Sequence, residues 1–248
     1  MQNLNYGVIG NCSTAALISE KGAIEWLCFP EFDSPSVFAA ILDRQKGGHF
    51  GFKVTSDYKV TQSYVPHTNI LSTHFESEEG AFDVVDFMPC YPTSDGKDFY
   101  RPAEIYRYIR WAKGRPRMKV DYRPAPNYAR GKTIYNVTSQ YVETYSSAKN
   151  KDRQYLYSSL DLKKVVNHDE ITLEKDEFFL FSFNEKVIPV DIEREKLEYC
   201  RTLVYWLNWT DHAKRYTRYN EVIERSMLVL KLMTYRNGAV MAAVTTSL

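Results

Sequence analysis

The sequence predicts a mainly β protein, in which an antiparallel β-sandwich of many short strands is followed by two α-helices. Three observations support this fold class. The 248 residues include 19 Tyr, 13 Phe and 4 Trp, and large flat side chains suit a pleated, half-buried surface. From Gly48 to about Val190, short alternating segments are separated by turn residues, which is typical of a sandwich. After Pro189 the apolar residues take a helical spacing.

The first 50 residues predict two strands and a short helix. Residues 6–29 read as strand, turn and strand, with Ile24, Trp26 and Cys28 on one face at a period of two. Ser34 and Pro35 then predict a helix of about two turns over residues 36–43, since serine is a good cap and proline suits the first helical position. Asp33, placed among aromatic residues, either caps this helix, orders the turn, or is an acid with a raised pKa.

The middle of the chain predicts the strands of the sandwich. Each segment is short and alternates apolar with polar residues, and glycine-containing turns such as Glu79-Gly80 and Lys113-Gly114 separate several of them. The segments are HFGFKV, YKVTQSYV, ILSTHFES, FDVVDFMP, IYRYIRWA, RMKVDYRP, KTIYNVTS, QYVETYSS, YLYSSL and EFFLFSF.

The last 58 residues predict helices that need a partner. In the first helix an apolar stripe at a spacing of three to four consists of Leu197, Cys200, Val204 and Leu207, widened by Leu203 and Trp206. The next helix, within residues 219–235, is apolar on nearly all sides and is stopped by Asn237-Gly238, and such helices belong inside a larger structure. We therefore expect a piece of a longer protein, with a sandwich over 1–190, a helical linker over 191–217 and the start of a further domain over 218–248.

Charge and motif content exclude several classes of function. The net charge is +1, so nothing attracts nucleic acid or an anionic membrane to the chain as a whole. Residues 101–132 hold ten Lys or Arg against two acids, interleaved with tyrosines; we interpret them as exposed strands with a basic face and keep polyanion binding as an alternative. No metal-ligand spacing, cofactor motif, leader or apolar span occurs, and the four cysteines predict buried free thiols. A cytoplasmic protein without membrane partner, metal or cofactor is expected.

Four segments resemble a known enzyme family. YGVIGNCSTAALISEKGAIEWLCFPEFDSPSVFAAILDRQKGGHF is similar to the N-terminal signature of glycoside hydrolase family 15, which includes bacterial glucoamylases, glucodextranases and trehalase-like enzymes. FDVVDFMP, RMKVDYRPAPNYARG and VIERSMLVLKLMTYRNGAVMAAVTTSL agree in the same order, so the resemblance covers essentially the whole chain. Ser13 departs from it, since many members carry a basic residue there.

The resemblance implies an N-terminal sandwich, a helical linker and an (α/α)₆ barrel whose first helix is VIERSMLVLKLMTYRNG. It also implies inverting hydrolysis of terminal α-glucosidic bonds by two glutamates, with carboxyl groups about 6.5–9.5 Å apart. Both lie beyond Leu248 in such enzymes, so no catalytic residue is assigned and the chain alone is expected to be inactive. The aromatics of residues 25–42 are expected in the core or an interface, while the loop near Trp26, Phe29, Asp33 and Ser34 is the candidate wall of the sugar pocket.

The preferred hypothesis is thus a non-catalytic N-terminal domain that supports the barrel of an enzyme acting on α-glucosides. The alternative is a free-standing carbohydrate-binding sandwich with an aromatic platform, for which the candidates are Tyr106, Tyr108, Trp111 and Tyr128. Exposed apolar surface on the C-terminal helix would also favour self-association.

Overall fold

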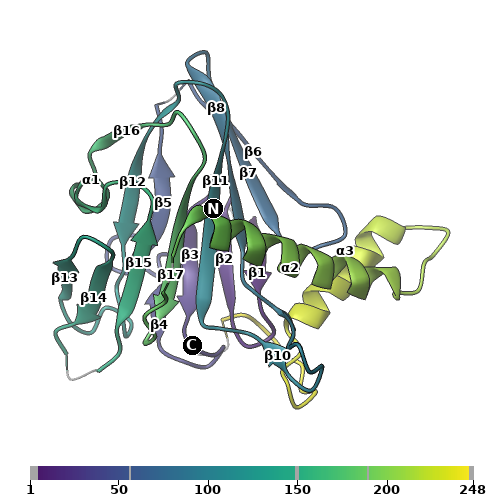
Figure 1. Ribbon diagram of the computed structural model, residues 1–248. Coiled ribbons are helices and arrows are strands. Elements are labelled where there is room, and N and C mark those ends of the chain that lie inside the picture. The colour runs from purple at the N-terminus through teal and green to yellow at the C-terminus, as the bar shows by residue number, and fades with distance from the viewer. Residues whose placement is uncertain (1–4, 56, 149–150, 189, 246–248) are drawn as a thin grey trace.

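The computed structural model describes residues 5–55, 57–148, 151–188 and 190–245 (Figure 1). Within these ranges it contains 17 strands and three helices, which confirms the predicted mainly β class. Thr246, Ser247 and Leu248, the end of the segment that resembles the start of a barrel, lie outside the described residues.

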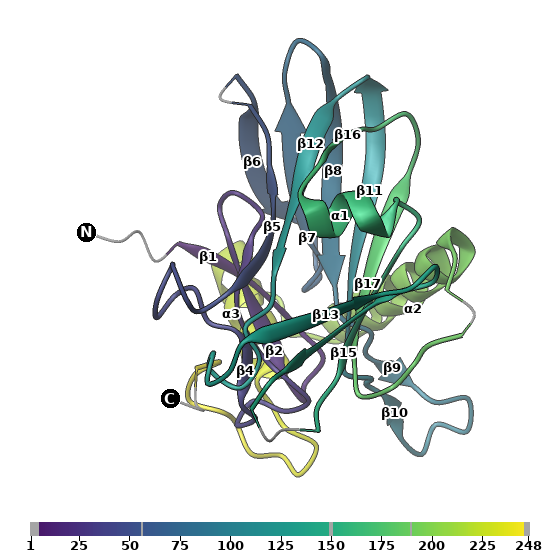
Figure 2. The ribbon, with the colours of Figure 1, turned by 90° about the vertical axis from the view of Figure 1, so that its left-hand side faces the viewer.

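Two antiparallel sheets face each other (Figures 1 and 2). Sheet A has the strand order β1-β2-β3-β5-β12-β16, with β4 paired to β3. Its strands are β1 (Tyr6–Gly10), β2 (Ala15–Ser19), β3 (Ile24–Cys28), β4 (Ser36–Phe38), β5 (His49–Lys53), β12 (Arg117–Arg123) and β16 (Glu170–Thr172).

Sheet B has the order β13-β14-β15-β17-β11-β8-β7-β6. Its strands are β6 (Lys59–Tyr64), β7 (Leu71–Glu76), β8 (Gly80–Phe87), β11 (Glu104–Gly114), β13 (Thr133–Val137), β14 (Val142–Ser146), β15 (Gln154–Ser158) and β17 (Glu177–Phe183). Between β8 and β11 the chain forms a small separate hairpin of β9 (Tyr91–Pro92) and β10 (Phe99–Tyr100).

Sheet B is buried on both faces at its centre. All seven residues of β17 are buried. Phe179 and Phe181 point into the core between the sheets, whereas Leu180 belongs to a second core on the outer face. This explains why EFFLFSF has no polar face, because alternation is expected only where one face meets water.

A buried arginine that forms an ion pair within sheet B also bonds to sheet A. Arg107 of β11 donates from Nε to Asp86 Oδ1 at 2.7 Å, and Asp86 lies opposite it on β8. The same guanidinium donates to the carbonyl of Phe50 in β5 at 2.6 Å and to the carbonyl of Gly22. One fully buried arginine therefore satisfies acceptors in both sheets.

The predicted helix over residues 36–43 is wrong. Ser36–Phe38 form the strand β4, which pairs with β3 through Leu27 opposite Phe38. All three β4 residues are buried, and Phe38 packs against Phe50 and Phe181. Burial and pairing of a Val-Phe segment therefore override the helix-start signal of Ser34 and Pro35. A six-residue helix that the sequence did not predict, α1 (Leu162–Asn167), precedes β16 and is capped by Asp161.

The two predicted C-terminal helices are present. α2 (Ile192–Asp211) begins with Asp191, whose side chain accepts from the Arg194 amide, and crosses the outer face of sheet B (Figure 1). α3 (Asn220–Leu232) packs Leu232 near β1, where a Cβ on Gly10 would approach that side chain to 2.9 Å. Glycine thus allows α3 to dock closely. Within the described residues no helix is long and apolar enough to span a bilayer.

Candidate functional site

The aromatic residues of the candidate pocket wall are buried. Trp26 has no exposed surface, and its indole Nε1 donates to the carbonyl of Val244 at 2.8 Å. Phe29 stacks on Phe181 in the core between the sheets, with ring centroids 5.9 Å apart, and Phe32 belongs to the core on the outer face of sheet B. The expectation that these aromatics are core or interface residues is confirmed.

Asp33 and Ser34 are the members of the candidate wall with accessible surface. Asp33 is exposed, and Ser34 is half-buried. The Ser34 hydroxyl accepts from the Glu31 amide at 3.1 Å, so it orders the turn. Because no helix follows, Asp33 is not a helix cap. Contact of Trp26, Phe29, Asp33 or Ser34 with a sugar stays a prediction.

The segment after α3 returns to this turn. Burial, and then a hydrogen bond with Glu31, raise the pKa of Tyr235 to about 12, and the charge of Asp33 acts in the same direction. Together with the bond from Trp26 to Val244, this brings the last described residues beside residues 26–33. The last described residues therefore lie near the candidate pocket wall.

The apolar stripe of α2 points outward, which is the largest departure from the sequence prediction. The exposed fractions are 48% for Leu197, 63% for Val204 and 39% for Leu207, and Cys200 is also exposed. The prediction of a buried thiol is therefore wrong for Cys200 and confirmed for the other three. The buried residues of α2 are Glu195, Glu198, Thr202, Tyr205, Trp206 and Thr210. Tyr205 and Trp206 belong to the apolar cluster on the outer face of sheet B, and Leu203 packs against it, so this side of α2 is mixed.

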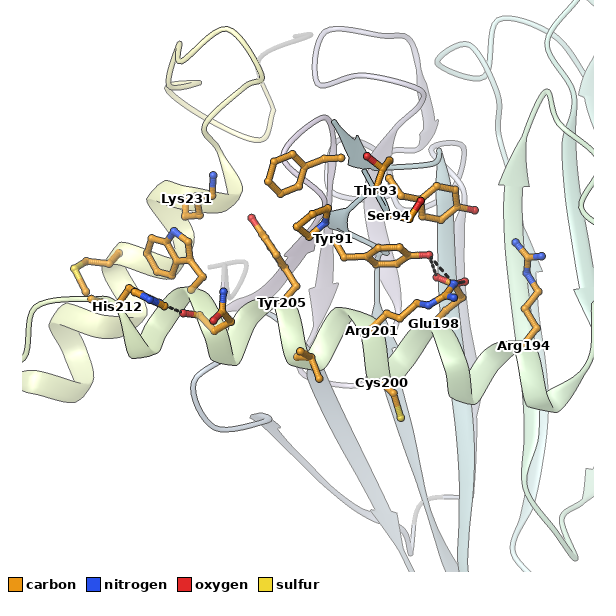
Figure 3. Close-up of a pocket in the computed structure, with 18 residues that line it drawn as sticks. Tyr91, Thr93, Ser94, Arg194, Glu198, Cys200, Arg201, Tyr205, His212 and Lys231 are labelled. Carbon is orange, nitrogen blue, oxygen red and sulfur yellow. Dashed lines mark hydrogen bonds and ion pairs between the residues drawn. The ribbon is translucent and has the colours of Figure 1, made fainter. Parts of the chain in front are cut away.

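A large groove of about 1350 Å³ lies between the β9–β10 hairpin, α2 and α3 (Figure 3). Its walls are aromatic: Tyr91 packs on Tyr100 with ring centroids 5.1 Å apart, and Phe99 meets Tyr205 edge to face at 5.9 Å. Cys200 and Val204 of the α2 stripe also line it, as do Met227 and Lys231 of α3. The groove exceeds the usual volume of a small-molecule site, about 300–1000 Å³.

One end of the groove carries a polar cluster. The Tyr91 hydroxyl donates to Glu198 Oε2 at 2.7 Å, and Arg201 Nη1 lies 3.3 Å from Glu198 Oε1 (Figure 3). Burial, and then the hydrogen bond with Glu198, raise the pKa of Tyr91, so the phenol remains a donor. The hairpin is thereby fixed to α2, and the groove is preformed.

The carboxyl group of Glu195 in α2 is buried without a hydrogen-bond partner among the described residues. Glu195 is 1% exposed, and neither of its carboxyl oxygens has a hydrogen bond among the described residues. Burial raises its pKa well above the usual range, and the nearby carboxyl groups of Asp86, Glu198 and Glu104 add to the shift. Both effects favour the neutral carboxylic acid over the carboxylate. Sequence reasoning missed it because a glutamate in the first turn of a helix is usually solvated.

The basic region of residues 101–132 is largely neutralised by local ion pairs. Besides the buried pair of Arg107 and Asp86, its pairs are Arg110–Asp83, Lys113–Glu76, Arg115–Glu174, Arg117–Glu79 and Arg123–Asp121. This favours the interpretation of basic strand faces over a polyanion site, and the absence of a nucleic-acid partner stays a prediction.

The candidate aromatic platform is not assembled on one surface. Tyr106 is 1% exposed and stacks on Phe87 under α2, whereas Tyr128 packs in a separate cluster with Trp26. Trp111 is 38% exposed on β11, so Tyr106, Tyr128 and Trp111 do not offer a sugar a common flat face. Tyr108 is half-buried, and its hydroxyl donates to Asp176. Among the described residues no group of three or more His, Cys, Asp or Glu is arranged to hold a metal ion.

Comparison with known proteins identifies the family. Residues 5–150 match the family described as trehalase-like, N-terminal, which is more than half of the chain. The chain belongs to this family.

The domain is similar to part of several trehalases. It is 30% identical to the trehalase of Thermoplasma acidophilum over 242 residues, which is 94% of this chain and 40% of that protein. It is 28% identical to the trehalase of Mycolicibacterium smegmatis, covering 98% of this chain and 40% of that protein. Over 85 residues, 34% of this chain and 14% of the relative, it is 51% identical to trehalase 1 of Sulfolobus acidocaldarius. The trehalase-like N-terminal domain thus spans about 40% of the length of the first two relatives.

Proposed function

We propose that this chain is the non-catalytic N-terminal domain of an inverting glycoside hydrolase and supports its catalytic domain. The observation that carries the proposal is the outward apolar stripe of α2. In an isolated domain it is unfavourable for α2 to expose Leu197, Val204 and Leu207 to water while it buries the carboxyl group of Glu195. The arrangement is favourable if a second layer covers the stripe, since burying each such side chain contributes about 1.5–3 kcal/mol.

The occupant that we propose for the stripe and the groove is the catalytic part of the same enzyme. The relatives are about two and a half times as long as this chain, judged from the 40% of their length that it covers. The segment after α3 would connect the sandwich to the catalytic part, because Trp26 of the sandwich donates a hydrogen bond to the carbonyl of Val244 in that segment. In this proposal residues 1–190 are the sandwich, 191–217 the linker, and 218–248 the start of the catalytic barrel.

The chemistry would reside in the catalytic part. In an inverting glycosidase one carboxylic acid protonates the leaving oxygen, while a carboxylate about 6.5–9.5 Å away activates water on the opposite face. We assign neither group to this chain. The relatives are named trehalases, which favours trehalose among the α-glucosides as the substrate of the whole enzyme. We also propose that the whole enzyme belongs to glycoside hydrolase family 15, which the sequence resembles. Asp33, which is exposed, and Ser34, which is half-buried, lie beside the end of the described chain and are the residues we propose for the pocket wall.

The test is glucose release from trehalose, maltose, maltotriose and isomaltose. The 248-residue chain is compared with a chimera in which it precedes the unmatched C-terminal part of the Thermoplasma acidophilum trehalase. Release by the chimera alone is expected, with trehalose the preferred substrate. Release by the short chain would overturn the non-catalytic role. An inactive chimera whose two parts fold but do not dock would overturn the supporting role.

A further inference from the structure

Two cysteines from distant parts of the chain meet in the core under α2. Cys12 follows β1, and Cys90 lies between β8 and β9, 78 positions later. Their sulfur atoms are 4.0 Å apart, and both residues are fully buried. Cys12 is held in the left-handed region, with φ of 64°, which is uncommon for a residue other than glycine.

The pair adjoins both the groove and the end of α3. Cys12 Sγ donates to the carbonyl of Lys231 at 3.4 Å. Tyr91, which follows Cys90, lines the groove together with Tyr205 and Lys231. The thiols therefore lie directly behind residues that would contact whatever fills the groove.

The two thiols are chemically unequal. The hydrogen bond from Cys90 lowers the pKa of Cys12, and the charges of Lys231 and Arg101 add to this effect. The same bond raises the pKa of Cys90. Thiol–disulfide exchange needs one attacking thiolate and one resolving thiol. Cys12 suits the first role and Cys90 the second.

We propose that Cys12 and Cys90 form a reversible intramolecular disulfide by exchange with a low-molecular-weight disulfide such as oxidised glutathione. Local opening near the groove would admit the oxidant. The Cys12 thiolate attacks one sulfur of glutathione disulfide, that S–S bond breaks, and one glutathione leaves as a thiolate that takes up a proton. Cys90, after losing its proton, attacks the mixed disulfide at Cys12 and expels the second glutathione. Two protein thiols are oxidised, and one glutathione disulfide is reduced to two thiols.

Oxidation would be transmitted to α3. Bond formation brings the sulfur atoms from 4.0 Å to about 2.05 Å and removes the thiol hydrogen that Cys12 donates to Lys231. That carbonyl also accepts from the Thr234 amide at 3.1 Å at the end of α3. The disulfide would therefore loosen the last turn of α3, next to the groove. This proposal does not depend on the proposed enzymatic role.

The sequence provides a direct test, because trypsin places the four cysteines in four different peptides. Cys12 lies in residues 1–21, Cys28 in 22–44, Cys90 in 60–97 and Cys200 in 197–201. The full chain is equilibrated in glutathione buffers of increasing oxidation, with brief exposure to mild urea so that buried thiols exchange. Free thiols are then blocked at low pH, and the digest is analysed by mass spectrometry.

The expected result is peptide 1–21 linked to peptide 60–97 with the loss of two hydrogens, while Cys200 carries a glutathione adduct. The link should vanish in Cys90→Ser, and reduction should reverse it. Amide exchange at residues 233 and 234 should be faster in the oxidised chain. If both peptides are recovered unlinked in samples where Cys200 is fully modified, the two cysteines are only buried apolar groups and the proposal is overturned. A link without any change in exchange would overturn the coupling to α3.

Discussion

On its inner face, sheet B meets sheet A through a layer of phenylalanine and aliphatic side chains, where Arg107 forms a buried ion pair with Asp86. On its outer face it meets α2 through a mixed set that includes Tyr205, Trp206 and the carboxyl group of Glu195, which has no hydrogen bond among the described residues. Leu197, Val204 and Leu207 of α2 are exposed. The inner interface is buried within this chain, whereas α2 leaves Leu197, Val204 and Leu207 exposed. Four changes would test this difference.

The largest effect is expected from Arg107→Met. The substitution would leave Asp86 buried without its partner and remove the donors to Phe50 and Gly22. Breaking one side of a buried pair costs about 3–5 kcal/mol, so the free energy of unfolding measured in urea should fall by about that amount. The matched control is Arg110→Met, since Arg110 pairs with Asp83 on the same two strands but is 53% exposed. A loss as small as that of the control would show that the pair does not hold the sheets together.

The double variant Arg107→Met, Asp86→Leu sharpens the same point. Replacing both partners by apolar groups leaves no buried charge, so it should recover most of the loss caused by Arg107→Met alone. Urea denaturation of the four proteins of the cycle measures the coupling. No recovery would mean that the bonds to the Phe50 and Gly22 carbonyls, rather than the charge pair, provide the stability.

Most strands of the inner interface could be predicted because their segments alternate in the sequence, and β17 could be predicted from its short apolar run. The helices after residue 190 could be predicted from the spacing of their apolar residues. The face that α2 presents could not. Spacing identifies Leu197, Cys200, Val204 and Leu207 as one stripe, but it does not say whether the sandwich or another domain covers that stripe. The β4 strand was missed for a related reason, since Ser34-Pro35 is a local signal and the pairing of Phe38 with Leu27 is not local.

The groove could not be predicted either. Tyr91 and Glu198 are 107 positions apart, and nothing in the local sequence of either residue shows that the hydroxyl reaches the carboxylate. The same holds for Cys12 and Cys90, which meet only because β8 ends beside the turn after β1.

The next largest effect is expected from Val204→Asp, and only when the catalytic part is present. In the 248-residue chain Val204 is 63% exposed, so the unfolding free energy should change by no more than about 0.5 kcal/mol. In the chimera the change should weaken docking by about 1.5–3 kcal/mol, the value of burying such a side chain. The measurement is the midpoint of thermal unfolding of each protein.

Val137→Asp is the matched control for docking, because Val137 is 36% exposed on β13, at the edge of sheet B away from α2 (Figure 1). It should affect the short chain and the chimera alike. If Val204→Asp also affects both alike, the catalytic part does not cover the stripe. Concentration-dependent dimers of the short chain that Val204→Asp abolishes would assign the stripe to self-association instead.

The effect expected from Glu195→Gln depends on pH: it is absent near pH 4 and grows as the pH rises. The folded-state pKa of Glu195 is raised by burial and by the nearby carboxyl groups of Asp86, Glu198 and Glu104. The folded protein therefore binds a proton that the unfolded chain releases above pH about 4.3. Stability from this group is complete below that pH and is lost as pH rises toward the folded pKa, at about 1.4 kcal/mol per pH unit. The amide resembles the neutral acid, so the variant should match the native chain near pH 4 and exceed it increasingly toward pH 8.

Glu193→Gln separates this effect from a general change of charge. Glu193 lies in the same first turn of α2, but its side chain is 77% exposed. Its substitution should leave the pH dependence of the unfolding free energy unchanged. Parallel plots of the unfolding free energy against pH for the native and Glu195→Gln proteins, from pH 4 to 8, would mean that Glu195 is ionised when folded. The interface between α2 and sheet B would then hold a charge. If only the Glu195→Gln curve is flatter, the buried Glu195 of α2 is neutral in the folded protein at these pH values.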